Sequence, residues 1–357
     1  MGHICEQAFD LQQLSKPKII RSKAPLRLGL AGGGTDVSPY SDQFGGAILN
    51  ATVDLYALTS IEPLDQDIII LESFDQGEKY THNHSVQLAI NGELDLLKGV
   101  YNHISKNYNV SIPGFHLTTF VDAPKGSGMG SSSTITVSIL GAFVEWLNLP
   151  LGEYDIARTA YEIERVELGM AGGKQDQYAA TFGGVNFMEF YADDKVIVNP
   201  LRIRADYINE LNINFLLYYT GTSRLSAKII EEQVDSFKKK GTGSIEAAHK
   251  VKEQAFRMKE ALLTGKLDEV GKILDFGWYN KKKMAPGISN AVIDEIYDAA
   301  KFAGATGGKI SGAGGGGFMM FYCPGNSRFQ VKNALAGFGG RFKDFQFTKH
   351  GLTTWSS

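Results

Sequence analysis

The alternation of apolar and polar positions along the chain predicts a mixture of strands and helices. Short apolar or alternating runs are typical of strands, whereas apolar positions three and four residues apart are typical of helices. Strands are predicted at residues 19–30, 47–58, 67–74, 79–81, 115–121, 185–191, 214–220, 318–323 and 341–348. Helices are predicted at residues 94–107, 135–147, 154–169, 177–182, 226–239, 246–263, 267–274, 292–303 and 327–336. Residues 1–17 are predicted to form a polar arm or a short helix.

The spacing of these elements predicts the fold class. Strands and helices alternate, but not at the regular spacing of a doubly wound parallel sheet, so we predict an α+β fold with two layers in each domain. The chain becomes polar at residues 192–194, and we place the domain boundary between residues 200 and 212. The predicted domains are therefore residues 1–205 and residues 206–357.

The composition and charge of the chain argue against a nucleic-acid-binding, membrane or secreted protein. The 357 residues are 43% hydrophobic and carry a net charge of -3, so no global field favours nucleic acid or a membrane surface. No apolar run is long enough to span a bilayer, and the N-terminal residues lack a signal-peptide pattern. Cys5 and Cys323 lie far apart in the sequence, which predicts no disulfide and fits a reducing, cytoplasmic compartment. The lysine runs at 238–240 and 281–283 are predicted to be solvated helix faces or loop edges.

The loop at residues 124–134 predicts an anion site. It reads Pro-Lys-Gly-Ser-Gly-Met-Gly-Ser-Ser-Ser-Thr and joins a predicted strand to a predicted helix. Glycines let backbone N–H groups approach an oxyanion, and the free N–H groups and dipole of the helix start favour negative charge. The lysine precedes the glycines, so the loop is neither a Walker A loop nor a dinucleotide fingerprint. We predict that a nucleotide triphosphate is bound by Lys125, Gly126, Ser127, Gly128, Met129, Gly130, Ser131, Ser132 and Ser133. A plain glycine connection with helix-capping serines is the alternative.

A second glycine-rich segment follows the first predicted strand, which carries Arg27. An ionised aspartate is only an acceptor, so Asp36 in a glycine turn can accept two hydroxyls of a polyol. The residues predicted to bind substrate here are Gly33, Gly34, Thr35 and Asp36. The alternative is that Asp36 only stabilises the turn.

Two further stretches carry candidate chemistry. Glu164 lies near the end of a predicted helix, and Lys174 and Asp176 follow in a glycine-rich loop. A carboxylate beside a lysine can act as a base, although Asp176 could instead cap the next helix and Glu164 could lie on the surface. The backbone of residues 307–317, with Gly314 and Gly315, can pass very close to a phosphate or a substrate; a flexible linker is the alternative.

Together these motifs resemble those of the GHMP kinase superfamily, which includes galactokinase, homoserine kinase, mevalonate kinase and phosphomevalonate kinase. They occur in the order found in the family and extend over residues 24–317. Residues 31–36 (AGGGTD), 173–178 (GKQDQY) and 219–224 (YTGTSR) are most similar to the branch that acts on a heptose 7-phosphate.

The resemblance implies a fold and a set of roles. The fold would have an N-terminal α+β domain with a left-handed βαβ crossover and a C-terminal ferredoxin-like domain. Magnesium would bind to Ser132 and Glu164, although the spacing from Glu164 to Asp176 is one residue longer than in mevalonate kinases. Asp176 would be the catalytic carboxylate, Arg27 would pair with it and with the transferred phosphoryl group, and Asp36 would bind the sugar.

The resemblance also implies an activity. The protein would use ATP and magnesium to phosphorylate the anomeric hydroxyl of D-glycero-D-manno-heptose 7-phosphate in nucleotide-activated heptose biosynthesis. The partners would be ATP and the sugar phosphate, and the protein would bind neither nucleic acid nor membrane. Whether it forms a homodimer is left open. We expect the distal phosphate and the sugar to meet Lys174, Gly221, Arg224, Lys228 and Lys309. The alternatives are a kinase of an unphosphorylated sugar, such as L-fucose or galactose, and a non-catalytic protein that senses sugar and ATP.

Overall fold

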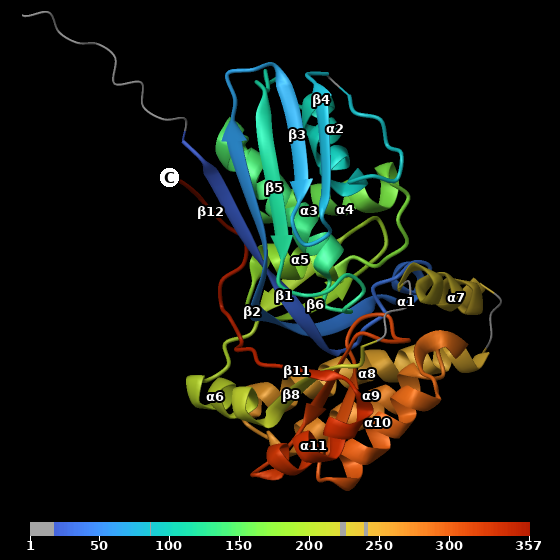
Figure 1. The fold of residues 1–357 in the computed structure, drawn as a ribbon. Coiled ribbons are helices and arrows are strands. Elements are labelled where there is room, and N and C mark those ends of the chain that lie inside the picture. Colours follow the sequence, from blue (N-terminus) through green and yellow to red (C-terminus); the bar gives the residue numbers. More distant parts are fainter. Residues whose placement is uncertain (1–17, 86, 222–225, 239–241) are drawn as a thin grey trace, which may run out of the picture.

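The computed structural model describes residues 18–85, 87–221, 226–238 and 242–357. The prediction for residues 1–17 lies outside these ranges. Figure 1 shows two α+β units, one above the other, each built on its own sheet. We call them the first unit and the second unit in chain order. The α+β class predicted from the sequence is confirmed.

The first unit is built on a mixed sheet with the strand order β12-β1-β2-β5-β3-β4. Strands β3 and β5 are parallel and are joined by a crossover through β4 and helix α2, while the other pairs are antiparallel. The sheet continues from β2 through β6 to β7. Its strands are β1 (Ile20–Ala31), β2 (Gly46–Pro63), β3 (Ile68–Ser73), β4 (Glu78–Asn83), β5 (Phe115–Val121), β6 (Val185–Phe190), β7 (Val196–Pro200) and β12 (Thr353–Ser356).

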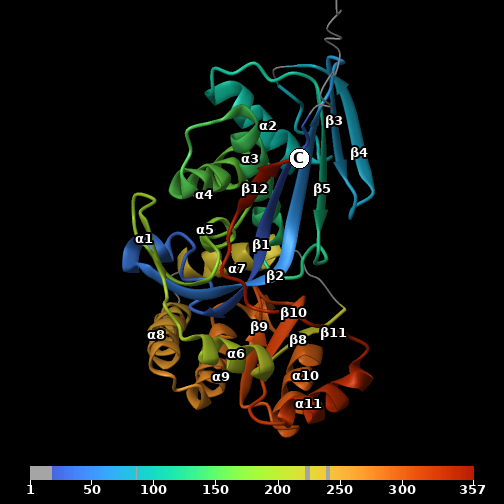
Figure 2. The same cartoon turned by 90° about the vertical axis from the view of Figure 1, so that its left-hand side faces the viewer.

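Helices cover one face of this sheet (Figure 2). The central one, α3, packs against β1 and β2 and is buried over most of its length. Its unusually apolar sequence follows from this position, because a helix enclosed on all sides has no polar face. The helices are α1 (Tyr40–Phe44), α2 (Asp95–Asn107), α3 (Ser131–Leu147), α4 (Glu153–Tyr161), which continues into a π-helical turn (Glu162–Glu167), and α5 (Gln175–Phe182).

The second unit has a sheet of antiparallel strands in the order β11-β8-β10-β9. The unit's first strand in the chain therefore lies between its last strand and its third, which is the ferredoxin-like arrangement that the family resemblance implied. The strands are β8 (Phe215–Tyr219), β9 (Gly307–Ile310), β10 (Phe318–Tyr322) and β11 (Arg341–Lys343). The helices are α6 (Ala205–Asn214), α7 (Ser226–Lys238), α8 (Thr242–Thr264), α9 (Asp268–Lys281), α10 (Ala291–Phe302) and α11 (Ser327–Leu335).

The two units share a hydrophobic core. Buried side chains of β1 and β2, such as Leu28 and Val53, belong to the same cluster as Phe215, Met258 and Leu274 of the second unit. Burial of apolar surface on this scale is the main favourable term in association. The loops at the junction of the two sheets are thus held from both sides, and the candidate site lies there.

The last strand was missed by the sequence analysis. The strand predicted at 341–348 ends at Lys343, and the chain then returns to the first unit, where β12 pairs with β1. Residues of β12 are largely exposed and polar, so the apolar pattern gave no signal for it. The division at residues 205 and 206 stays a prediction. Among the described residues, no helix is long and apolar enough to cross a membrane.

Candidate active site

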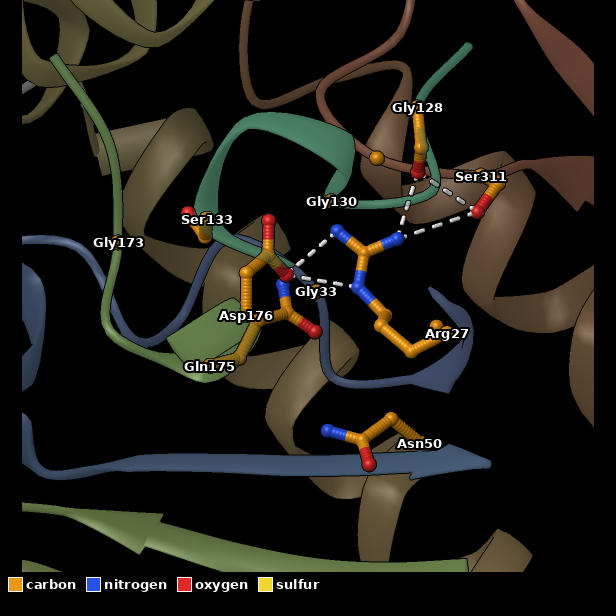
Figure 3. A network of polar contacts seen from close by, with 12 residues as sticks. Arg27, Gly33, Asn50, Gly128, Gly130, Ser133, Gly173, Gln175, Asp176 and Ser311 are labelled. Atoms are coloured by element: carbon orange, nitrogen blue, oxygen red, sulfur yellow. Dashed lines mark hydrogen bonds and ion pairs between the residues drawn. The ribbon is translucent and has the colours of Figure 1, made fainter. Parts of the chain in front are cut away.

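An ion pair between a buried arginine and a partly exposed aspartate lies at the centre of the junction. Arg27 on β1 is 3% exposed, and its Nη2 lies 2.6 Å from Oδ1 of Asp176 in the first turn of α5. Its Nε donates to the same oxygen at 2.7 Å, while Nη1 donates to the carbonyl of Gly128 at 2.6 Å and approaches Ser311 Oγ at 3.4 Å (Figure 3). One guanidinium therefore joins β1, α5, the loop before α3 and the loop after β9.

The 124–130 loop reaches this pair because its glycines take up backbone conformations that side chains disfavour. Gly126, Gly128 and Gly130 have φ angles of 75°, 78° and 77°, in the left-handed region that glycine occupies without steric cost. A Cβ on Gly128 would lie 2.2 Å from the carbonyl oxygen of Ser311, and one on Gly130 would lie 3.0 Å from Cγ of Asp176. The glycines thus permit a close approach that would otherwise be blocked.

A cavity of about 600 Å³, here called the cleft, opens at the ion pair. Its walls come from both units and include Arg27, Asp36 and Asp176. Of the residues predicted to bind the triphosphate, those that line the cleft are Lys125, Gly126, Gly128, Gly130, Ser131, Ser132 and Ser133. Met129 instead points into the core shared by the two units, and Ser127 is fully buried.

A smaller cavity of about 350 Å³, the side cavity, adjoins the cleft. The two share Met170, Lys125 in the glycine loop, and Ser131 and Ser132 at the start of α3. The other walls of the side cavity are apolar where they come from α2, α3 and β5, with Leu97, Ile135 and Val121 among them. They are polar at the β3–β4 hairpin, which contributes Ser73, Asp75, Gln76 and Glu78. A flat apolar group can thus occupy the side cavity while an attached anion extends to the helix start and the cleft.

Glu164 is fully buried beside the start of α3. Its Oε2 accepts from Ser133 at 2.7 Å and from Gln177 at 2.6 Å, and Arg165 lies 3.1 Å away. Its Oε1 accepts from Thr136 at 2.7 Å. The family resemblance implied that Glu164 and Ser132 bind magnesium together. In the structure, the serine that donates a hydrogen bond to Glu164 is the next one, Ser133.

Magnesium is commonly held by one or two carboxylates together with substrate phosphates. Ser132 on the cleft wall offers a hydroxyl oxygen to such an ion. The carboxylate of Glu164 lies next to Ser133, but it is fully buried and does not line the cleft. A carboxylate has about four lone-pair sites, and Oε1 of Glu164 accepts the hydrogen bond from Thr136. The described ranges contain no group of three or more Asp, Glu, His or Cys side chains placed to hold a metal ion, at this point or elsewhere.

Asp36 holds the segment that carries Asp176. It is 2% exposed, and its Oδ2 accepts from the backbone N–H groups of Lys174 at 2.9 Å and Gln175 at 3.0 Å. A Cβ on Gly173 would lie 2.0 Å from this oxygen, so glycine is required there. Burial raises the pKa of the Asp36 carboxyl, and the N–H donors of Gln175 oppose that shift. Asp36 therefore lines the cleft and also fixes the start of α5.

The other predicted substrate residues are placed differently from one another. Gly34 lines the cleft, but Thr35 is buried and uses its hydroxyl to bond the carbonyls of Gly32 and Ala47. Gly315 donates to the carbonyl of Ile288, so it packs against a neighbouring turn. Gly312 and Ala313 line the cleft instead of Gly314 and Gly315.

The predicted basic cluster is not assembled at the cleft by its described members. Lys174 is 4% exposed, and its Nζ pairs with Asp194 at 2.6 Å. Lys309 is also buried and donates to a backbone carbonyl of β1, and Lys228 is exposed on α7. Gly221 is exposed at the end of the described segment, and Arg224 lies outside the described residues.

The prediction that Lys281 lies on a solvated face was wrong. The sequence analysis assigned residues 281–283 to a solvated face, but Lys281 is 4% exposed and lines the cleft. Helix α9 is longer than predicted, and Lys281 follows Trp278 and Leu274 at spacings of three and seven residues on its buried face. That periodicity was the available signal. The sequence analysis also missed Gln175 and Gln233, which line the cleft.

The fold and the cleft define a two-unit α+β protein with a glycine-rich loop between its sheets. Residues 95–184 match the family described as "GHMP kinases N terminal domain", and residues 258–340 match "GHMP kinases C terminal". The chain belongs to the GHMP kinase family.

Particular relatives cover nearly the whole chain. It is 46% identical to a "D-glycero-alpha-D-manno-heptose 7-phosphate kinase" of Campylobacter jejuni over 95% of this chain and 99% of that protein. A solved structure named "D-glycero-D-manno-heptose 1-phosphate kinase", from Bacteriodes thetaiotaomicron, superposes with a TM-score of 0.81 at 46% identity and covers 94% of this chain and 98% of that one. An "L-fucokinase/L-fucose-1-P guanylyltransferase" of Bacteroides fragilis is 27% identical over 85% of this chain, which spans 34% of that protein.

Replacing Gly128 by alanine is expected to destabilise the fold more than the same change at Gly77. Both have left-handed φ angles, so each variant should lose about 1–2 kcal/mol of unfolding free energy. At Gly128 the new methyl also meets the Ser311 carbonyl, whereas nothing lies within 4 Å of it at Gly77. We expect a further loss of about 1–3 kcal/mol in urea denaturation. Equal losses in the two variants would contradict the close approach.

Proposed function

We propose that this protein transfers the γ-phosphoryl group of ATP to the anomeric hydroxyl of D-glycero-D-manno-heptose 7-phosphate, giving the 1,7-bisphosphate. The observation that carries the proposal is the Arg27–Asp176 pair, which lies in the cleft between the 124–130 loop and Asp36. A carboxylate that can take a proton, next to a cation that can meet a phosphoryl group, suits phosphoryl transfer. The similarity to the Campylobacter jejuni relative over nearly its whole length supports the choice of substrate.

ATP would extend from the side cavity into the cleft. The apolar walls of the side cavity suit the base, and the start of α3 at Ser131 suits the phosphates, because free N–H groups and the helix dipole favour anions. The shared wall at Lys125, Ser131 and Ser132 would then follow the phosphate chain from one cavity to the other. Magnesium on Ser132 and Glu164 would neutralise phosphate charge.

The residues of the cleft would divide the remaining work. Phosphoryl transfer depends on alignment and neutralisation of charge more than on covalent chemistry. Asp176 would orient the acceptor hydroxyl and take its proton, and Arg27 would stabilise the equatorial oxygens of the transferred group. An anomeric hydroxyl is more acidic than an ordinary alcohol, so an ionised aspartate suffices as the base. Asp36 would hold the start of α5 and face the sugar.

A panel of acceptors tests the substrate. We expect kcat/KM for heptose 7-phosphate to exceed that for free heptose by about 100-fold, which is about the contribution of one hydrogen bond to a charged phosphate. L-fucose and galactose test the alternative that the protein phosphorylates an unphosphorylated sugar. The similarity to the Bacteroides fragilis L-fucokinase is the reason for including this alternative. Heptose 1-phosphate tests the acceptor named for the solved structure. Phosphorus NMR of the product identifies the new phosphate, and equal rates with and without the 7-phosphate would exclude our choice.

Asp176→Asn is expected to lower kcat by about 10³-fold, because an amide cannot accept the hydroxyl proton. ATP binding, measured by calorimetry, should stay within a few fold, since in this proposal Asp176 contacts the acceptor hydroxyl and not ATP. Asp193→Asn is the control, because Asp193 is exposed in the turn between β6 and β7. Turnover close to that of the wild type would reject Asp176 as the base.

Val121→Trp is expected to raise the KM for ATP about tenfold or more while leaving the KM for the sugar unchanged. Val121 lines the side cavity, and an indole would occupy space that we assign to the base. Val166→Trp is the matched control, since Val166 is 72% exposed on the π-helical turn. An unchanged KM for ATP in the Val121 variant would place the base elsewhere.

A further inference from the structure

Lys281 brings a cation from the second unit to the wall of the cleft. It is the last residue of α9, it is 4% exposed, and it lines the cavity that also contains Arg27, Asp36 and Asp176. The motifs that carry the family resemblance in the sequence do not include it. Its position therefore calls for an explanation of its own, because a buried lysine costs free energy unless its charge is used.

The hydrogen bonds of Lys281 fix its ammonium group but leave one proton uncommitted. Its Nζ donates to the carbonyl of Gly33 at 3.1 Å and to that of Gly312 at 3.0 Å. Gly33 belongs to the turn before Asp36. Gly312 packs against the 124–130 loop, since a Cβ on Gly312 would lie 2.7 Å from Cα of Gly128. A lysine ammonium has three N–H donors. Both observed partners are neutral carbonyls, so one donor stays available for a molecule in the cleft.

The charged groups around Lys281 come from the first unit as well as the second. The groups that act on it electrostatically are Asp36, Asp176 and Arg27, and it acts in turn on Lys309. Burial lowers the pKa of Lys281 to about 8, with Arg27 adding to the effect and the two aspartates opposing it. Burial, followed by Lys281 and Arg27, lowers the pKa of Lys309 as well.

We propose that Lys281 is a further catalytic residue, whose remaining N–H donates to the attacking oxygen of the acceptor sugar. This inference rests on the proposed kinase function. In the step, the acceptor O–H bond breaks and its proton passes to Asp176, the new O–P bond forms, and the bond from the γ-phosphorus to the leaving oxygen of ADP breaks. Lys281 keeps its own proton and stabilises the negative charge that develops on the attacking oxygen.

The contacts favour the reacting end of the sugar over its distal phosphate. Lys281 bonds Gly312, which packs on Gly128, and Gly128 accepts a hydrogen bond from Arg27. The ammonium is thus connected to the 124–130 loop and to the Arg27–Asp176 pair. In a heptose 7-phosphate the distal phosphate is separated from the anomeric oxygen by the length of the sugar, so it lies away from this pair.

The pH dependence of the reaction tests the proposal without a substitution. Lys281 carries its charge below a pH of about 8 and loses it above, so wild-type kcat should fall as the pH rises through that value. In Lys281→Arg the cation persists to higher pH, because a guanidinium stays protonated, and the fall should move upward or vanish. A fall at the same pH in the arginine variant would overturn the proposal.

Lys281→Met removes the charge while keeping an unbranched side chain. At pH 7 we expect kcat to fall about 100-fold with an unchanged KM for ATP, and the alkaline fall to disappear. Lys283→Met is the control, since Lys283 is exposed in the same segment. Thermal unfolding of each variant separates loss of catalysis from loss of fold, and the arginine variant serves if the methionine variant does not fold.

The acceptor panel separates the possible failures. If Lys281→Met raises only the KM for heptose 7-phosphate and leaves the rate with free heptose unchanged, Lys281 binds the distal phosphate and the proposal is wrong. If the wild type is active and Lys281→Met is equally active, the proposal fails while the kinase function stands. If the wild type phosphorylates none of the sugars, the proposed function fails and this inference falls with it.

Discussion

The ion pair between the buried Arg27 and the partly exposed Asp176 is the interaction on which the geometry of the cleft depends. A guanidinium and a carboxylate taken out of water lose hydration, and the loss is offset only when the pair is close and its remaining donors are satisfied. Here two nitrogens of Arg27 meet one carboxylate oxygen, and the third meets the carbonyl of Gly128. The pair thus fixes the relative positions of β1, α5 and the 124–130 loop.

The second unit is part of this arrangement. Ser311, which follows β9, donates to the same Gly128 carbonyl at 2.9 Å, and Lys281 reaches across to the turn at Gly33. Because the units also share an apolar core, a shift of one sheet against the other would disturb hydrogen bonds inside the cleft as well as packing. Phosphoryl transfer needs such alignment, since its rate depends on placing donor and acceptor in line.

The sequence predicted the elements and loops that local pattern controls. The strand at 115–121 has the bounds of β5, and the glycine loop before α3 lies where the anion site was expected. The ion pair itself was implied only through the family resemblance, because 149 positions separate its partners. Lys174 and Lys281 show what local pattern cannot supply. Lys174 forms an ion pair with Asp194 in the turn between β6 and β7. The buried Lys281 donates hydrogen bonds to backbone carbonyls of two loops. Neither partner is visible until the chain is folded.

The pairing of β12 with β1 has a consequence for the order of assembly. Residues 353–356 follow the second unit in the chain, yet they complete the edge of the first sheet beside Arg21 and Lys23. During synthesis the chain leaves the ribosome from its N-terminus, so β1 has one unpaired edge until the whole second unit has been made. An open strand edge invites pairing with other chains. Folding of the first unit is therefore finished only after translation of the second, and the nascent chain must protect that edge in the meantime.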